Sequence, residues 1–249
     1  MTVETMRHRH SELAGQRVVV VGGSSGIGLA TARRAAGLGA ELVIASRAPE
    51  SVTSALKHLP DSAVGRVLDV RDPEAVRGFF EAVGPHDHLA FTAGDALVSG
   101  PLTDVGIPAM QDFLAVRLWG AVTAVQAALP FVRRSVTLSG GAGLLRPTPG
   151  FTTAAVALGA IEAFTRAAAV ELAPVRVNAV FPGLVRSPLW KGMPAGERDR
   201  FFAGAAASIP VGRVGETADV AQAFTHLMTS GYTTGQTLVI DGGATIGAR

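Results

Sequence analysis

A glycine-rich segment near the start of the chain has the composition of a phosphate-binding turn. Residues 18–21 are four consecutive valines, which is typical of a short strand buried on both faces of a parallel sheet. The turn that follows comprises Gly22, Gly23, Ser24, Ser25, Gly26, Ile27 and Gly28. Glycines let the backbone approach an anion, and the free N–H groups and dipole of a helix N-terminus hold its charge. The segment predicts a nucleotide site, the alternative being a tight turn that binds nothing.

Polar residues follow other predicted strands at their carboxyl ends, where ligands bind in open α/β sheets. Arg47 comes after the second strand, where an adenosine ribose would lie. A carboxylate there would bind the ribose hydroxyls, whereas an arginine offers a planar charged fork to a 2′-phosphate. Arg47 therefore favours NADP(H) over NAD(H), with a surface arginine as the alternative. Asp69, after the third strand, could accept a hydrogen bond from the adenine amino group or cap its own turn.

The elements that must position these residues alternate between strands and helices. Strands are predicted at residues 18–21, 41–45, 64–68, 88–91, 135–138, 175–180 and 237–240. Helices are predicted after the glycine turn, after Asp72, and at residues 49–59, 108–129, 152–172 and 217–229. This alternation indicates an α/β fold, a single doubly wound parallel sheet with helices on both faces.

The domain organisation follows from these elements. Residues 16–249 are predicted to form one dinucleotide-binding domain, and residues 1–15 a polar N-terminal tail. The stretch 187–212 is predicted to be an irregular, mobile cover over the pocket. Its apolar side chains are Trp190, Met193, Phe201 and Phe202.

Composition limits the classes of function. The 249 residues carry a formal net charge of +2 and contain no cysteine, so disulfides and thiolate chemistry are excluded. There is no dense basic run, and nucleic-acid binding is not expected. Residues 7–10 are interpreted as a solvated tail rather than as metal or phosphate ligands, so no metal site is predicted. No apolar run is judged long enough to cross a membrane, and we expect a cytoplasmic protein.

Several motifs, taken in their order and spacing, resemble those of the short-chain dehydrogenase/reductase family over essentially the whole chain. They are residues 22–28, 68–70, 93–94, 171–173, 175–185 and 239–243. The resemblance implies a Rossmann-type fold, oxidoreductase activity on a small-molecule substrate, and a homotetramer or homodimer. It also implies an NADP(H) site lined by Gly22, Ser24, Ser25, Gly26, Ile27, Gly28, Arg47, Asp69, Val70, Ala93, Gly94, Pro182, Gly183, Val185 and Ser187.

The catalytic residues that the family uses are largely replaced. A typical family reductase carries a Tyr-x-x-x-Lys pair, a serine and an asparagine, and the lysine helps the tyrosine to donate a proton to the forming alkoxide. With the register set by residues 160–166 and 171–173, the tyrosine position falls on Ala154 and the lysine position on Leu158. The asparagine position falls on Arg117.

The serine position is ambiguous, because the alignment places Gly140 there and Ser139 one residue early. A loop shift could still deliver Ser139 to the pocket. The only tyrosine, Tyr232, is predicted to be structural. The candidate catalytic residues are therefore Ser139, which could orient an oxygen or relay a proton, and Arg117, which could stabilise an oxyanion. The alternatives are a turn hydroxyl for Ser139 and a structural or interface salt bridge for Arg117.

These residues predict an NADP(H)-dependent oxidoreductase with a non-standard active site. Hydride transfer needs the nicotinamide held at the right distance and angle from an electrophilic carbon. The expected substrate is the carbonyl, or an activated C=C or C=N bond, of an apolar small molecule. Two other classes stay open: a non-redox enzyme such as an isomerase or dehydratase, and a catalytically inactive NADP-binding regulatory subunit.

Overall fold

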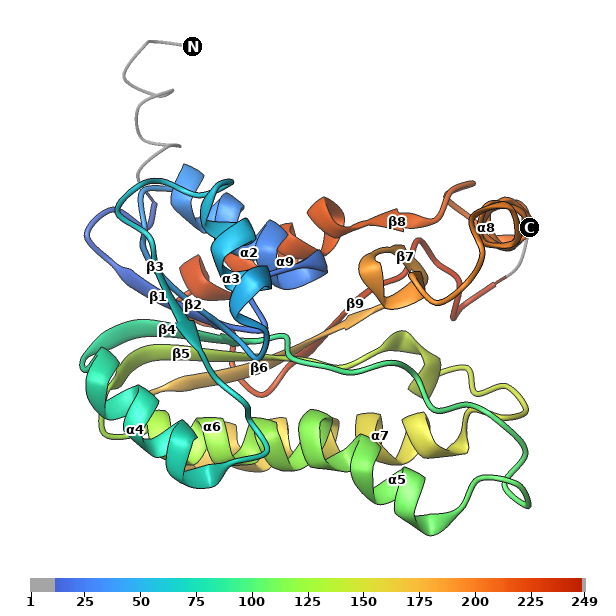
Figure 1. Cartoon of the computed structure of the whole chain (residues 1–249), viewed down its shortest axis with the longest axis horizontal. Coiled ribbons are helices and arrows are strands. Elements are labelled where there is room, and N and C mark those ends of the chain that lie inside the picture. The colour runs from blue at the N-terminus through green and yellow to red at the C-terminus, as the bar shows by residue number, and fades with distance from the viewer. Residues whose placement is uncertain (1–11, 248–249) are drawn as a thin grey trace, which may run out of the picture.

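A computed structural model of the chain describes residues 12–247, which are built around a seven-stranded sheet (Figure 1). The strand order is β3-β2-β1-β4-β5-β6-β9, and all neighbouring strands are parallel. The strands are β1 (Arg17–Val21), β2 (Glu41–Ser46), β3 (Val64–Val67), β4 (His86–Phe91), β5 (Val132–Ser139), β6 (Arg176–Pro182) and β9 (Thr237–Ile240). The order changes direction between β1 and β4, which makes their carboxyl ends the expected ligand position. The predicted doubly wound sheet is confirmed.

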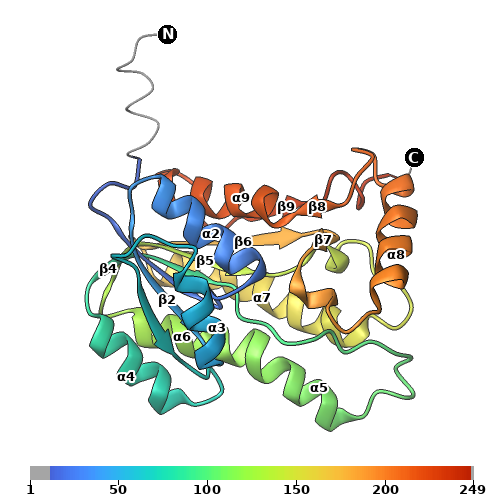
Figure 2. The same cartoon turned by 45° about the horizontal axis from the view of Figure 1, so that its top comes forward.

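The helices cover both faces of this sheet (Figures 1 and 2). One face carries α2 (Gly26–Gly37), α3 (Pro49–Leu56) and α9 (Thr217–Thr229). The other carries α4 (Pro73–Val83), α5 (Ile107–Leu114), α6 (Gly120–Ala128) and α7 (Thr152–Glu171). The predicted bounds of α9 and β9 are confirmed, and the Asp72 side chain caps α4 by accepting from the Glu74 and Ala75 N–H groups.

The four valines of β1 pack alternately against the two layers of helices. Val18 and Val20 pack in the core beneath α2 and α9, whereas Val19 and Val21 pack beneath α4, α6 and α7. All four are buried. The period-two alternation of a strand sends successive side chains to opposite faces, so a strand covered on both sides has no polar position.

The predicted long helix at 108–129 is interrupted by a π-helical turn. The turn, η1 (Ala115–Trp119), joins α5 to α6. Such turns insert extra backbone into a helix and are found mostly where a side chain must be re-aimed, often at functional sites. In this chain the turn carries Arg117.

The stretch 187–212 is not irregular, contrary to the prediction for this segment. This stretch contains a short 3₁₀ turn, η3 (Pro188–Trp190), and the helix α8 (Ala195–Ser208). Two helix-weakening glycines, Gly196 and Gly204, made the helix hard to recognise in the sequence. Phe202 of α8 is buried with Ile209 and Val214 in a small core of its own.

Two further predictions, on membrane-spanning segments and on the N-terminal tail, need correction. By length and composition alone, α7 could cross a membrane, with a mean hydropathy of 1.3, contrary to the expectation that no run was long enough. Its inner face is packed against the sheet, as in the core helices of water-soluble proteins.

Leu13, inside the predicted polar tail, is fully buried, and its N–H donates to the Leu38 carbonyl. Residues 7–10 lie outside the described part.

Candidate functional site

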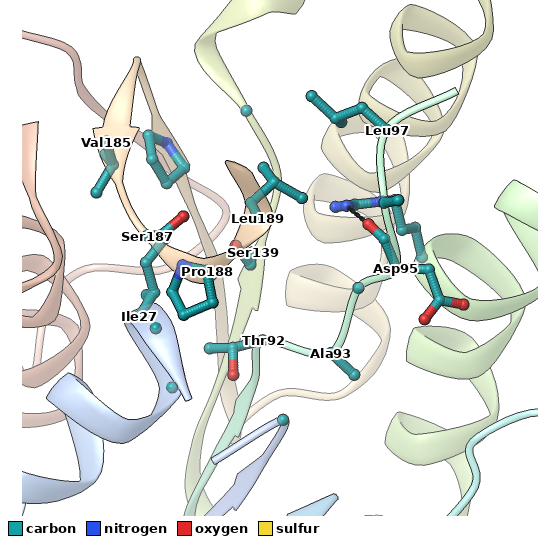
Figure 3. A pocket seen from close by; sticks show the side chains of 18 of the residues that line it. Ile27, Thr92, Ala93, Asp95, Leu97, Ser139, Val185, Ser187, Pro188 and Leu189 are labelled. Atoms are coloured by element: carbon teal, nitrogen blue, oxygen red, sulfur yellow. Dashed lines mark hydrogen bonds between the residues drawn. The ribbon is translucent and has the colours of Figure 1, made fainter. Parts of the chain in front are cut away.

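A cavity of about 820 Å³ opens at the carboxyl ends of the parallel strands (Figure 3). Every residue predicted for the coenzyme site lines it, as do both candidate catalytic residues, Ser139 and Arg117. The two positions assigned to the missing tyrosine and lysine, Ala154 and Leu158, line it as well. The topology thus brings together segments from almost the whole described chain, from Val21 to Thr245.

The glycine turn is packed too closely for side chains. Gly22 has a φ of 87°, and a Cβ there would lie 2.5 Å from the Ala93 backbone nitrogen. A Cβ on Gly28 would collide with the Gly22 carbonyl oxygen and the Thr92 hydroxyl. Thr92 in turn donates to the Val21 carbonyl at 3.0 Å, which ties the turn to the end of β4. The glycines therefore give a bare backbone cradle at the first turn of α2.

The N-terminus of α2 is open to an anion. Ser25 occupies the N-cap position, but its side chain makes no capping hydrogen bond. The first turn of α2 carries no acidic residue. The first N–H groups of a helix have no partner within the helix, and its dipole adds positive potential at this end. The cradle therefore has the geometry and the charge to hold a phosphate group.

Arginines and aspartates gather beyond the cradle, at the ends of β2, β3 and β4. Arg47 lines the cavity, and its Nη2 donates to Asp95 Oδ1 at 3.2 Å. The Arg71 Nη2 donates to the other carboxylate oxygen of Asp95 at 2.8 Å. Asp69 Oδ1 accepts from the Arg71 backbone N–H at 3.0 Å, which is the turn-capping alternative for this residue.

Arg117 enters the cavity from the π-helical turn. Its guanidinium lies over the Phe113 ring, 4.9 Å from the centroid, and donates to the Asp95 carbonyl. Burial lowers its pKa from the ordinary value, and its Nε is buried with no hydrogen-bond partner. A Cβ on Gly94 would lie 2.8 Å from the Arg117 Nη1, so the guanidinium occupies the space above this glycine.

No carboxylate among residues 12–247 forms an ion pair with Arg117. The alternative of an intrachain salt bridge is therefore wrong for the described residues. A partly buried guanidinium whose only hydrogen-bond partner is a neutral carbonyl keeps its positive charge available to a ligand.

The structure explains the ambiguity at the serine position. Ser139 ends β5 and lines the cavity. A Cβ on Gly140 would collide with the Phe181 ring, so residue 140 cannot carry a serine while Phe181 keeps its place. Of these two positions, only residue 139 can therefore present a serine hydroxyl to the cavity.

Apolar side chains of α7 line part of the remaining wall, and two cations that were not predicted as site residues, Arg146 and Lys191, line the cavity as well. Ala154 and Leu158 of α7 are buried, and Phe151 lies before them. Tyr232 is fully exposed and does not line the cavity. Lys191, which follows η3, does line it. Only its rarity in the chain distinguished this lysine in the sequence.

The cover contributes fewer aromatic side chains to the cavity than predicted. Trp190 lines it, and its Nε1 donates to the Val185 carbonyl at 3.1 Å. The Phe201 ring lies 5.2 Å from Trp190 but, like Phe202 and Met193, does not line the cavity. The rings of Phe201 and Phe202 pack against Trp190 instead of facing the cavity.

The chain matches known oxidoreductases along most of its length. A family model described as enoyl-(acyl carrier protein) reductase matches residues 21–245. The short-chain dehydrogenase/reductase ATR9 of Stachybotrys chlorohalonatus is 35% identical over 250 residues, which cover 93% of this chain and 98% of that protein.

Two solved structures share the fold. An NADPH-bound short chain oxidoreductase of Pseudomonas aeruginosa PAO1, described as containing an atypical catalytic center, is 30% identical with a TM-score of 0.86, covering 94% of this chain and 98% of that one. The MalC reductase/Diels-Alderase of Malbranchea aurantiaca is 26% identical with a TM-score of 0.88, covering 95% and 98%. With its parallel sheet and its cavity at the strand ends, this chain belongs to the short-chain dehydrogenase/reductase family and is an oxidoreductase of that type.

Proposed function

We propose that this protein is an NADP(H)-dependent reductase with a non-standard active site, in which Arg117 and Ser139 act on the substrate in the absence of the family's Tyr-x-x-x-Lys pair. The observation that carries the proposal is the partly buried Arg117 guanidinium, which lines the same cavity as the glycine cradle and has no carboxylate partner among residues 12–247. Ala154 and Leu158, in the positions expected for tyrosine and lysine, offer neither a proton nor a charge.

The cavity fits the coenzyme. The cradle of Gly22 and Gly28 leaves backbone room for a pyrophosphate at the first turn of α2, where a side chain would collide with the end of β4. Arg47 would bind the 2′-phosphate of the adenosine ribose, and Ser187 would contact the nicotinamide amide. When bound, the coenzyme supplies the hydride. The NADPH-bound relative from Pseudomonas aeruginosa supports this assignment.

Arg117 stabilises negative charge on the substrate. Its guanidinium is partly buried, which strengthens its attraction for an anion that develops during hydride transfer. It does not act as the proton donor, because an arginine is effectively always protonated. Ser139 orients the accepting atom or relays a proton from water to it.

The substrate that suits these residues is an apolar, already activated acceptor such as a conjugated enone, whose oxygen gains negative charge as the hydride arrives. Ala154, Leu158 and Phe151 give the substrate side an apolar wall. An activated acceptor needs little help from a strong acid at oxygen, which this cavity does not provide.

The test is transfer of deuterium from NADPH deuterated at C4 to a panel of ketones, conjugated enones and cyclic imines. We expect loss of NADPH absorbance that matches the deuterated product one to one, fastest for the conjugated enones. Product formed without net NADPH oxidation or deuterium incorporation would indicate an isomerase or dehydratase instead. Tight NADPH binding without turnover across the panel would indicate a regulatory subunit.

We also infer that the protein forms a homodimer or homotetramer through the outer face of α7 and the neighbouring π-helical turn. Large apolar side chains are exposed there: Trp119 is 61% exposed, Val156 48% and Val170 81%. Light scattering should report an oligomer for the parent protein and a smaller species for Val170→Glu. A monomeric parent protein would contradict the inference. The cytoplasmic location stays a prediction.

A further inference from the structure

Asp95 connects the two halves of the cavity through three arginines. Its Oδ1 accepts from Arg47 at 3.2 Å, and its Oδ2 accepts from Arg71 at 2.8 Å. Its backbone carbonyl accepts from Arg117, the hydrogen bond drawn at Asp95 in Figure 3. Nothing in the family pattern of the sequence marks this residue, which simply follows the Ala93-Gly94 motif.

The ion pair between Arg47 and Asp95 lies across the coenzyme cradle. Arg47 follows β2 and Asp95 follows β4, and these two strands flank β1 on either side. The glycine turn starts at the end of β1, so the ion pair spans the end of that strand. Both residues line the cavity. In this structure, the side chain best placed for a 2′-phosphate is therefore already bound to a carboxylate.

The two ion pairs of Asp95 differ in their surroundings. The side chain of Arg47 is 56% exposed, whereas that of Arg71 is 30% exposed. The Arg71 pair is also the shorter of the two. Exposed ion pairs contribute little, because water and salt screen them. The Arg47 pair is thus the one that opens, while Arg71 keeps Asp95 in place and with it the carbonyl that anchors Arg117.

We propose that Asp95 is a positioning residue that competes with the coenzyme's 2′-phosphate for Arg47. This inference rests on the proposed use of NADP(H). A phosphate dianion forms stronger charge-assisted hydrogen bonds with the guanidinium fork than a single carboxylate does, so it takes over Arg47. The uncharged ribose hydroxyls of NAD(H) have no such advantage. Asp95 therefore weakens binding of the phosphorylated coenzyme by a fixed factor, and it holds Arg47 in place while the site is empty of phosphate.

The test measures calorimetric binding of 2′,5′-ADP and 5′-AMP, which represent the adenosine half with and without the extra phosphate. Asp95→Asn keeps the shape of the side chain and a neutral hydrogen bond but removes its charge. We expect 2′,5′-ADP to bind roughly 3- to 10-fold more tightly to this variant. Binding of 5′-AMP should change by less than about 2-fold. Asp95→Ser is a second variant with the same expected direction.

Asp112→Asn is the matched control. Asp112 also pairs with Arg71, at 3.2 Å, but it does not line the cavity. Its removal should leave both affinities unchanged. In an Arg47→Gln background, Asp95→Asn should no longer improve 2′,5′-ADP binding, because the competition acts through Arg47.

The two proposals fail in different ways. If the parent protein binds 2′,5′-ADP no more tightly than 5′-AMP, the use of NADP(H) is overturned and this inference with it. If the parent protein prefers 2′,5′-ADP, and both Asp95 variants bind it equally or more weakly, the competition is overturned while the proposed coenzyme stands. Improvement that persists in the Arg47→Gln background would also overturn the competition.

Discussion

The proposed coenzyme half of the cavity and its proposed substrate half are built from different parts of the chain. The coenzyme half depends on backbone: bare glycines, the first turn of α2 and a close contact with the end of β4. The substrate half depends on side chains, with Arg117 above Gly94 and the apolar Ala154 and Leu158 in the lining. A backbone cradle allows few substitutions, whereas a side chain can be exchanged while the fold persists. This explains why the first half follows the family pattern and the second departs from it.

A substitution in the glycine cradle should give the largest effect and is the strongest test of this comparison. Gly28→Ala should lower NADPH affinity by roughly 1000-fold, about 4 kcal/mol, because overpacking at the turn adds to the loss of phosphate contacts. The new methyl group would collide with the Gly22 carbonyl oxygen. Calorimetric titration gives the affinity, and circular dichroism verifies that the sheet persists.

Gly37→Ala is the control for this substitution. Gly37 ends the same helix, and a Cβ there meets nothing within 4 Å. NADPH affinity should stay at the parent value. A Gly28→Ala protein that binds NADPH normally would show that the cradle is not the phosphate site.

A buried polar side chain that does not line the cavity, His88, provides a second comparison. His88 of β4 is fully buried, with Ser135 Oγ and Gln16 Oε1 each 2.8 Å from a ring nitrogen. Burial lowers the pKa of His88 to about 4. Because this lies below the ordinary 6.5, protonation favours the unfolded chain. The stability contributed by neutral His88 is present above about pH 6.5 and is lost as the pH falls towards 4.

Chemical unfolding between pH 7 and pH 4 should therefore show a loss of up to about 3 kcal/mol from His88. In His88→Gln the slope across this window should be shallower, even though the variant is less stable overall. Equal slopes in the parent protein and in His88→Gln would contradict the assignment.

The sequence was informative where the chemistry depends on backbone and periodicity. The valines of β1 and the glycines after them indicated the first strand, the cradle and its position in the sheet. Sequence spacing could not show that η1 is π-helical, because Ala115–Trp119 has no composition that distinguishes such a turn. Nor could it show that Asp95 binds Arg47 and Arg71, since these contacts join three separate strand ends. The serine ambiguity depended on Phe181, a long-range contact with Gly140.

The substrate half is tested by removing the partly buried charge. Arg117→Met keeps a long apolar side chain over Phe113 but removes the guanidinium. We expect kcat for the best acceptor of the substrate panel to fall roughly 100-fold, as when one donor to a developing oxyanion is lost. The affinity for NADPH should change by less than about 3-fold. Pre-steady-state hydride transfer separates the chemical step from product release.

Gly94→Ala tests the same guanidinium by crowding it instead of removing it. Its methyl group would lie 2.8 Å from the Arg117 Nη1, so the guanidinium must shift. A smaller loss of kcat in the same direction is expected. If both variants turn over at the parent rate, Arg117 has no part in the reaction.

Ser139 should give the smallest effect, because its hydroxyl only assists an acceptor that is already activated. Ser139→Ala should lower kcat roughly 10-fold and leave NADPH affinity unchanged. The solvent isotope effect distinguishes the two roles proposed for the hydroxyl. If Ser139 relays a proton, the parent protein should show an isotope effect on kcat that changes in the variant. If it only orients the acceptor, the rate should fall with no change in the isotope effect. Ser208→Ala, at the end of α8 and outside the cavity, should alter neither quantity.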